Sequence, residues 1–388
     1  MKKVLALVLA VLFCLSLVAC GGTASDEKVI KIGVFEPSTG DSASGGKKEI
    51  LGMQYANAET PTVMIGGEEY KVELVLADNG SSTDKAPSAA TALVNADVAI
   101  VLGSYGSGVS MAGSEFFDQA GLAAIGVTCT NPNVTAGNSH YFRICFLDPF
   151  QGSVLANFAA QKFGAKKAYL LGELGNEYDQ GLITFFEQAF VAAGGEVMKD
   201  SYPTNQADFT TYLNKAKDFG AEVIFTPVSI AYATQIITQA ATLGITAPIL
   251  GSDTLDDNKV LEAAKGTDVK VYVSTFYQEG GNPEFDAGIK NYINTNSEAL
   301  TANGGNDTIS AVTAMGYDAY YVALEAIKAA GSADKAAIKA ALPSVQYTGV
   351  SGDIAFDTIG DAVRDTAYIK TSDNANAAWI LETVQKAN

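Results

Sequence analysis

The sequence predicts an α/β protein of two lobes, each built on a largely parallel sheet that helices cover on both faces. The first observation is that strand-like and helix-like runs alternate along the chain, which is the pattern of parallel sheets. The second is that this alternation restarts near residue 165. The third is length, because 388 residues exceed what one ordinary hydrophobic core holds.

The first series of elements extends from residue 29 to residue 148. We expect helices around 47–59, 83–96 and 108–120. The strand-like runs between them are rich in β-branched and other apolar residues. They are VIKIGVFEP (29–37), YKVELVLADN (70–79), VAIVLGSY (98–105), LAAIGVT (122–128) and YFRICFLD (141–148).

The second series begins with a strand at 165–174 and a helix at 180–195, which a double glycine ends. Further strands are expected at 195–203, 221–229 and 247–253, with helices at 207–220 and before Gly244. Residues 283–342 are mostly helical in character. The run GDIAFDTIGD (352–361) returns to strand and turn character.

The N-terminus predicts a secretory leader and a lipid anchor. Two lysines precede an uncharged run, 4–18, and small residues follow it, as in a signal peptide covering 1–19. LVAC (17–20) has the form of a lipobox, in which Cys20 is lipidated and 20–28 form a tether. The alternative is an ordinary signal peptide with a chance cysteine. Either way we expect a location outside the cytoplasm, with attachment to the membrane if Cys20 is lipidated.

Charge and composition exclude several classes of partner. The formal net charge is −18, which argues against nucleic acid as a partner. His140 is the only histidine and is expected to be an exposed turn residue, so no metal site is predicted. Cys129 and Cys145 follow the leader, and the sequence leaves open whether they form a disulfide. GSYGSG (103–108) and GGKKE (45–49) do not match nucleotide-binding motifs, so no cofactor is predicted.

Short hydroxyl side chains and glycines follow two neighbouring predicted strands. They occur in VLGSYGSGVS (101–110) and AAIGVTCTNPNVT (123–135). Ser107 precedes a predicted helix, whose first N–H groups bind anions well, and Thr128 and Thr130 add hydroxyl donors. Together they predict a site for a small carboxylate, although each side chain alone is equally suited to capping a helix or turn.

A cleft hydrolase is a second hypothesis with little support. Neither Ser104 nor Ser107 has the G-x-S-x-G frame of a nucleophile elbow, and any base would have to be His140. The acidic pair 256–257 is expected to be solvated charge at a helix start.

A set of motifs in a defined order resembles one protein family. The set is IGVFEPSTGD, VLGSYGSG followed by TNPNVT, YFRICFLDPFQG, NEYDQGL, ADFTTYL, TQIITQAATLG, ILGSD, MGYDA and GDIAFDTIGD. With this order the chain resembles type I periplasmic binding proteins of the leucine/isoleucine/valine-binding family, the substrate receptors of ABC importers. The resemblance extends over nearly all of the chain after the leader.

The resemblance implies two Rossmann-like lobes that are joined by three crossings of the chain and close on an amino acid. Crossings are expected near 147–149, 275–277 and 350–352. The N-terminal lobe would then comprise 29–147 plus 277–350, and the C-terminal lobe 148–276 plus 351–388.

The resemblance also assigns roles to residues. Ser107, Thr128 and Thr130 fall where the family holds the α-carboxylate, and Tyr178 and Asp253 where the second lobe reaches the ligand. Three positions at which the family places aromatic rings differ. This chain has Gly45 and Ser229 at two of them and an aliphatic residue near Val312 at the third. Tyr105 is expected to fill part of the space at Gly45, and Tyr232 lies one helical turn from Ser229.

The sequence therefore predicts a monomeric receptor that catalyses no reaction, binds a branched-chain or related amino acid and delivers it to an ABC permease. A receptor of the same fold for an amide, a urea or an aromatic acid is the alternative, because such ligands lack the α-ammonium that Asp253 would bind.

Overall fold

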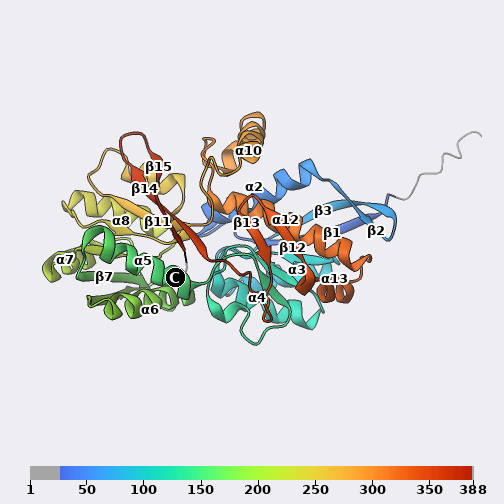
Figure 1. Cartoon of the computed structure of the whole chain (residues 1–388), viewed down its shortest axis with the longest axis horizontal. Helices are drawn as coiled ribbons and strands as arrows, with labels where there is room; N and C mark the ends of the chain where they lie inside the picture. Colours follow the sequence, from blue (N-terminus) through green and yellow to red (C-terminus); the bar gives the residue numbers. More distant parts are fainter. Residues whose placement is uncertain (1–26, 387–388) are drawn as a thin grey trace, which may run out of the picture.

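The computed structural model describes residues 27–386 and confirms the predicted α/β class, with two lobes side by side (Figure 1). The first lobe contains a six-stranded sheet in the order β2-β3-β1-β4-β5-β6. The second contains a seven-stranded sheet in the order β15-β14-β11-β10-β9-β7-β8. The expected signal peptide, the lipidation site Cys20 and most of the tether lie outside the described residues.

The first sheet is parallel except for its β2–β3 edge. Helices α2 and α12 cover one face, and α3 and α4 pack with the other in a separate apolar cluster. A Cβ at Gly52 would lie 2.0 Å from the Thr313 carbonyl oxygen, so glycine permits the close approach of α2 to α12. The bounds are β1 (Val29–Glu36), α2 (Ala43–Glu59), β2 (Thr62–Ile65), β3 (Glu68–Asp78), α3 (Ala86–Asn95), β4 (Ile100–Leu102), α4 (Ser107–Gln119), β5 (Ala124–Gly126), β6 (Tyr141–Arg143) and α12 (Ala311–Ala330).

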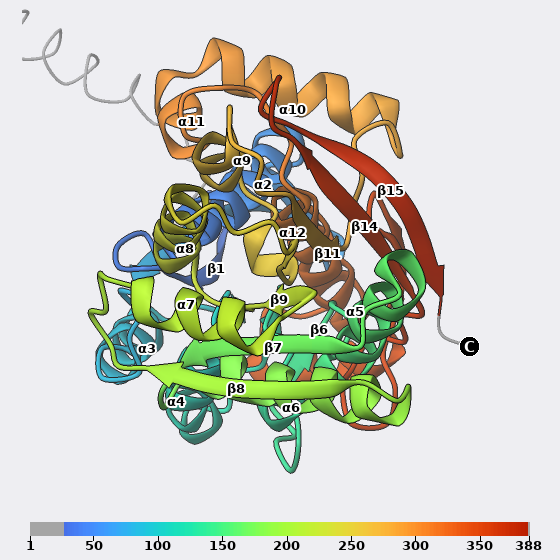
Figure 2. The same cartoon turned by 90° about the vertical axis from the view of Figure 1, so that its left-hand side faces the viewer.

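The second sheet is parallel from β8 to β11 and antiparallel at β14 and β15. Figure 2 turns this lobe toward the viewer, with α6 beside β8 and α5 near the end of β7. Residues of α7, α8 and α9 form a second apolar cluster. The bounds are α5 (Asp148–Phe163), β7 (Lys167–Glu173), α6 (Glu177–Ala192), β8 (Glu196–Tyr202), α7 (Thr210–Phe219), β9 (Val223–Phe225), α8 (Ile230–Thr242), β10 (Ile249–Leu250), α9 (Asn258–Ala264), β11 (Val271–Thr275), β14 (Thr366–Asp373) and β15 (Ala378–Lys386).

The other described elements are short or join the lobes. Helix α10 (Pro283–Thr295) packs on α2 and lies at the top of Figure 1. The rest are η1 (Pro132–Val134), η2 (Asp253–Leu255), α11 (Ser297–Ala302), α13 (Lys335–Ala341), η3 (Leu342–Ser344), β12 (Gln346–Gly349) and β13 (Gly352–Ala355).

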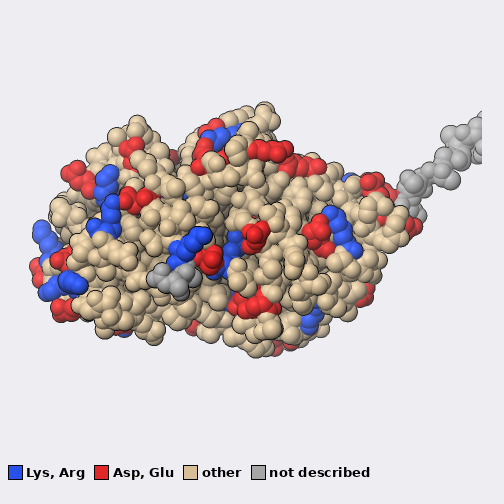
Figure 3. Space-filling view, viewed as in Figure 1, with Lys and Arg blue, Asp and Glu red and all other residues tan. Residues whose placement is uncertain are grey.

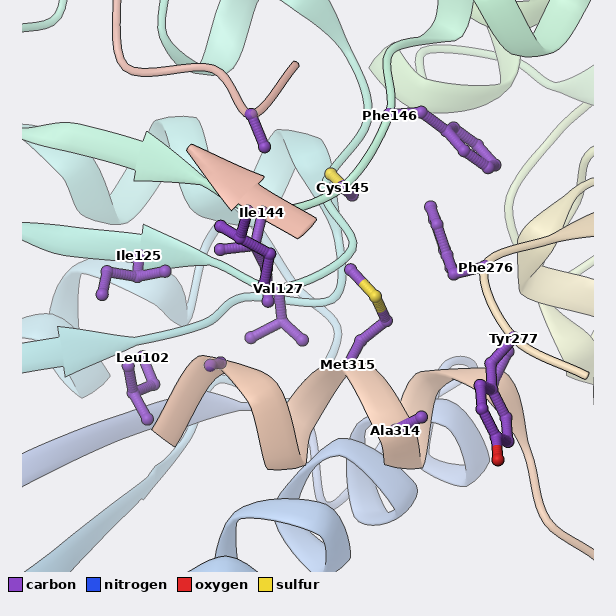
Figure 4. Close-up of a cluster of buried hydrophobic side chains, with 14 of the residues drawn as sticks. Leu102, Ile125, Val127, Ile144, Cys145, Phe146, Phe276, Tyr277, Ala314 and Met315 are labelled. Carbon is purple, nitrogen blue, oxygen red and sulfur yellow. The ribbon is translucent and has the colours of Figure 1, made fainter. Parts of the chain in front are cut away.

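Three segments connect the lobes. The first lies between β6 and α5, and the second between β11 and α10. The third lies further along the chain than the expected 350–352, because residues 360–362 still hydrogen-bond to Arg143 of β6, which leaves 363–365 as the link to β14. Phe146 and Phe276, from the first two segments, face one another with ring centroids 4.2 Å apart (Figure 4). The connections are therefore packed together.

Two further features concern membranes and metals. Within residues 27–386 no helix has both the length and the apolar character needed to cross a membrane. The same residues contain no group of three or more histidine, cysteine or acidic side chains arranged to hold a metal ion.

Candidate binding site between the lobes

A cavity of about 410 Å³ lies between the two lobes. Its wall comes from loops that follow strands of the first sheet (37–42, 79–84, 104–109, 128) and of the second (173–179, 204, 229, 254). In both sheets the strand order reverses here, between β1 and β4 and between β7 and β9. Open parallel sheets bind ligands at such reversals, outside the carboxyl ends of the strands.

The N-terminus of α4 supplies this cavity with backbone donors that have no partner within residues 27–386. Ser107, Gly108 and Val109 open the helix and line the cavity, whereas the amide of Ser110 already donates to Gly106 at 2.9 Å. The Ser107 hydroxyl accepts the N–H of Asn131 at 3.2 Å. Because the first amides of a helix have no partner within it and carry partial positive charge, this end suits a carboxylate.

The two threonines that the sequence assigned to the same carboxylate differ in position. Thr128 lines the cavity, and its hydroxyl donates to Glu49. Thr130 is fully buried and is not part of the cavity wall. Its carbonyl oxygen accepts the backbone N–H of Asp148 at 3.0 Å, and burial raises the pKa of the Asp148 carboxyl to about 8.

Tyr178 and Asp253 are brought together in the second lobe. The Tyr178 hydroxyl donates to the carboxylate of Asp253 at 2.7 Å, and the amide of Gln151 donates to the same oxygen at 2.7 Å. Tyr178 lines the cavity, while Asp253 lies behind it and is 1% exposed. The second carboxylate oxygen of Asp253 is buried without a partner among the described residues. Burial raises the pKa of Asp253 to about 6.

Tyr105 occupies the space above Gly45. A Cβ at Gly45 would lie 2.4 Å from two ring carbons of Tyr105, so only glycine leaves room for the ring. The Tyr105 hydroxyl donates to the carbonyl of Thr254 in the second lobe at 3.2 Å. The amide of Asn131 also crosses between the lobes, to the carbonyl of Glu177 at 2.9 Å. The lobes are therefore in contact around the cavity.

Sequence reasoning missed a buried pair of carboxyl groups at the inner end of the first lobe. Glu36 accepts the N–H of Tyr105 at 2.7 Å, and Glu49 accepts the Thr128 hydroxyl. Burial, followed by the charge of Glu49, holds the pKa of Glu36 well above its ordinary value, and burial also raises the pKa of Glu49. Both carboxyl groups therefore hold a proton more readily than exposed carboxyl groups do. A charged residue that ends an apolar strand at its carboxyl end is the signal that would have found Glu36.

Ser229 lies in the cavity wall as the residue before α8, and its hydroxyl has no partner among the described residues. Tyr232 is buried nearby, and its hydroxyl accepts the N–H of Asn205 at 3.0 Å. His140 is partly buried rather than exposed. It contacts Asp118 and Lys339 and does not line the cavity.

The acidic pair 256–257 is the clearest correction to the sequence analysis, because neither side chain is solvated. Asp257 is 2% exposed and pairs with Lys48 of α2 at 2.5 Å. Asp256 is equally buried and pairs with Lys370 at 3.0 Å. Both carboxylates find their cations more than 100 residues away, which no local pattern reveals.

Arg143 fixes the loop that carries Thr128 and Thr130. Its guanidinium is fully buried, donates to Asp361 at 2.5 Å, and also donates to the backbone carbonyls of Cys129 and Asn131. Cys129 and Cys145 are both buried and carry free thiols, which answers the question that the sequence left open.

A comparison with protein families identifies this fold. The family described as periplasmic binding protein matches residues 29–376, nearly all of the described chain. The chain belongs to the periplasmic binding protein family. This confirms the resemblance seen in the sequence motifs, and it implies a solute-binding protein located outside the cytoplasm.

Known periplasmic binding proteins resemble the chain over almost its full length. A leucine binding protein, LivK, from Thermotoga maritima superposes with a TM-score of 0.81 at 31% identity, covering 92% of this chain and 99% of that one. The branched-chain amino acid transporter substrate binding protein LivJ of Streptococcus pneumoniae, solved with isoleucine, gives 0.79 at 26% identity, with 93% and 99% covered. The Leu/Ile/Val-binding protein homolog 2 of Brucella abortus is 28% identical over 350 residues, 89% of this chain and 90% of its own.

Proposed function

We propose that this periplasmic binding protein captures a free amino acid between its lobes and delivers it to the permease of an ABC importer. The observation that carries the proposal is the chemistry of the cavity. One lobe presents unpaired helix amides at Ser107–Val109, and the other presents Tyr178 backed by the carboxylate of Asp253. A zwitterion matches this arrangement, because its carboxylate meets the amides and its ammonium meets a carboxylate.

The relatives support the same ligand class. LivJ of Streptococcus pneumoniae binds isoleucine, and LivK of Thermotoga maritima is a leucine binding protein. In our proposal the backbone atoms of the ligand are held as the sequence motifs imply, by Ser107 and Thr128 on one side and by Tyr178 and Asp253 on the other. Thr130 then acts behind the wall, where its carbonyl oxygen holds the backbone N–H of Asp148 at 3.0 Å.

The test is titration calorimetry of the full-length chain, purified in mild detergent and unfolded and refolded to remove bound solute. We expect at least one of the twenty standard amino acids to bind, and Asp253→Asn to weaken that binding by tenfold or more. Asp268→Asn is the matched control, since Asp268 is exposed and lies outside the cavity wall. No heat with any amino acid would refute the proposal, and an unchanged affinity in Asp253→Asn would show that Asp253 does not hold the ammonium group of the ligand.

We further propose that residues 1–19 are removed as a signal peptide and that Cys20 carries a lipid that anchors the protein outside the cytoplasm. The lipobox LVAC motivates this proposal. Cys20→Ser is expected to move the protein from the membrane fraction to the soluble extracytoplasmic fraction. Retention of Cys20→Ser in the membrane fraction would contradict it.

A further inference from the structure

The wall of the interlobe cavity carries acidic side chains and no basic ones. Its acids are Asp41, Asp84, Glu173, Glu177 and Asp179, and no lysine, arginine or histidine is among the lining residues. The chain is acidic overall, with 43 Asp and Glu against 25 Lys and Arg. On the outer face in Figure 3, however, both signs of charge are interspersed, so the absence of bases is particular to the cavity wall.

Two of these acids line the cavity from opposite lobes. Asp41 lies in the loop after β1, and Glu173 is the last residue of β7. Burial is the largest cause of the raised pKa of the Tyr232 hydroxyl, and the charges of Glu173 and Asp41 raise it further. Neither acid forms an ion pair within residues 27–386.

The same wall has few aliphatic side chains. Pro37, Val109 and Leu174 are its only residues with purely aliphatic side chains larger than a hydrogen atom, and Leu174 is 66% exposed. The rest is hydroxyl, amide, carboxylate and glycine, with the rings of Tyr105 and Tyr178. A buried leucine or isoleucine side chain gains its affinity from apolar contact, which aliphatic side chains supply at only three positions of this wall.

The size of the cavity also favours a ligand with a long side chain. The cavity, at about 410 Å³, is lined both by the α4 N-terminus and by Asp41 and Glu173. This volume leaves room beyond the carboxylate and ammonium of an amino acid for a long side chain. Its far end would meet Asp41 and Glu173, whose two carboxylates suit a positive charge.

We propose that the ligand is an amino acid with a basic side chain, whose distal cation lies between Asp41 of the first lobe and Glu173 of the second. This inference rests on the proposed function. It assigns to Asp41 and Glu173 the choice of side chain, while the α4 amides and Asp253 hold the part that all amino acids share. A cation placed between the lobes also ties their closure to the presence of the correct ligand.

Calorimetry with L-arginine, L-lysine and L-leucine tests the inference on the full-length chain. We expect arginine or lysine to bind at least tenfold more tightly than leucine. In Asp41→Asn/Glu173→Gln that preference should fall to within threefold, through loss of affinity for the basic ligand. Glu262→Gln/Asp268→Asn removes the same two charges from exposed positions outside the cavity and should leave the preference intact.

The outcomes separate the inference from the function on which it rests. If leucine binds as tightly as arginine, the protein is still an amino-acid receptor, but the inference that its ligand has a basic side chain is wrong. A preference for arginine that survives in Asp41→Asn/Glu173→Gln would overturn the assignment of these two residues. Failure of every amino acid to bind would overturn both. Thermal unfolding of each variant shows whether it folds, and we expect little change because Asp41 is exposed and Glu173 partly so.

Discussion

Asp253 shows at the scale of one residue how burial prepares a binding group. Its carboxylate is 1% exposed and accepts two hydrogen bonds on one oxygen, from Tyr178 and Gln151. The other oxygen has no partner within the described chain. A buried, half-satisfied carboxylate is costly in the empty protein and gains most when a cation arrives.

Binding is therefore expected to depend on pH through Asp253. Its pKa is raised to about 6 by burial, against hydrogen bonds from Gln151 and Tyr178, with the neighbouring charge of Asp256 adding to the rise. Protonation removes the charge that the ligand ammonium needs, so affinity should fall about tenfold between pH 7 and pH 5. Calorimetry between pH 7 and pH 5 measures this change in affinity.

The raised pKa of Asp253 also determines how the stability of the ligand-free protein changes with pH. A carboxyl whose pKa is raised on folding destabilises the ligand-free protein as pH rises through that pKa, so the empty protein should gain stability toward pH 5 while binding weakens. Asp253→Asn should bind more weakly and lose this part of the pH dependence. Glu49 and Asp148 also face this region with raised pKa values, and their titration would remain in the variant. A parent affinity that is constant from pH 7 to pH 5 would contradict the assignment.

At the scale of elements, α2 and the loop after β4 pack together because a small residue in one faces a large residue in the other. Gly45 in α2 has no side chain, and the ring of Tyr105 occupies that space while reaching Thr254 across the cavity. Gly45 therefore replaces the aromatic ring that the family resemblance implies in α2, and it leaves room for the ring of Tyr105 from the loop after β4. Tyr105 and Gly45 therefore form one structural unit, in which the position of the ring depends on the absence of a side chain at residue 45.

Gly45→Ala tests this unit. The added Cβ would lie 2.4 Å from ring atoms of Tyr105, so the ring or the helix must shift. We expect a loss of about 1–3 kcal/mol in the free energy of unfolding, as for other overpacked sites. The loss should shrink markedly in a Tyr105→Leu background, which denaturant unfolding of the four proteins of the cycle measures. Additive effects of the two substitutions would show that they do not act through one contact.

At the scale of the whole molecule, the two lobes are held together by contacts that flank the cavity. Tyr105 reaches Thr254, Asn131 reaches Glu177, and Lys48 pairs with the buried Asp257. The connecting segments pack through Phe146 and Phe276. We propose that this arrangement is the closed state of a hinge motion about the three connections, in which the interlobe contacts form and the connections absorb the dihedral change.

The two lobes are expected to close when the ligand binds. The radius of gyration from small-angle X-ray scattering should decrease when a saturating amino acid is added to solute-free protein. At about 100 times its Kd the same ligand adds about 2.7 kcal/mol to stability. Tyr105→Phe removes the interlobe hydrogen bond and should weaken binding and closure together, whereas Tyr292→Phe, whose hydroxyl forms no hydrogen bond in residues 27–386, should do neither. An identical radius with and without a bound ligand would exclude hinge closure.

The sequence by itself determined the α/β class, the order of the elements, the family and the strand ends that line the cavity. These follow from hydrophobic periodicity and from motifs, which are local properties of a chain. Helix bounds came close, as for α3, expected at 83–96 and found at Ala86–Asn95. Ser107 and Thr128 could be named because they lie shortly after predicted strands, and Tyr178 because the family resemblance assigns it a role.

Only the tertiary structure decided which side chains meet across the chain. Lys48 and Asp257 are 209 residues apart in sequence, yet their pairing turns an expected surface charge into a buried one. The same holds for Glu36 with Glu49 and for Tyr105 over Gly45, and Asp41 and Glu173 line one cavity from two lobes. The charge state and shape of a binding site depend on burial and on partners brought together by folding, and neither is encoded in the local pattern around any one residue.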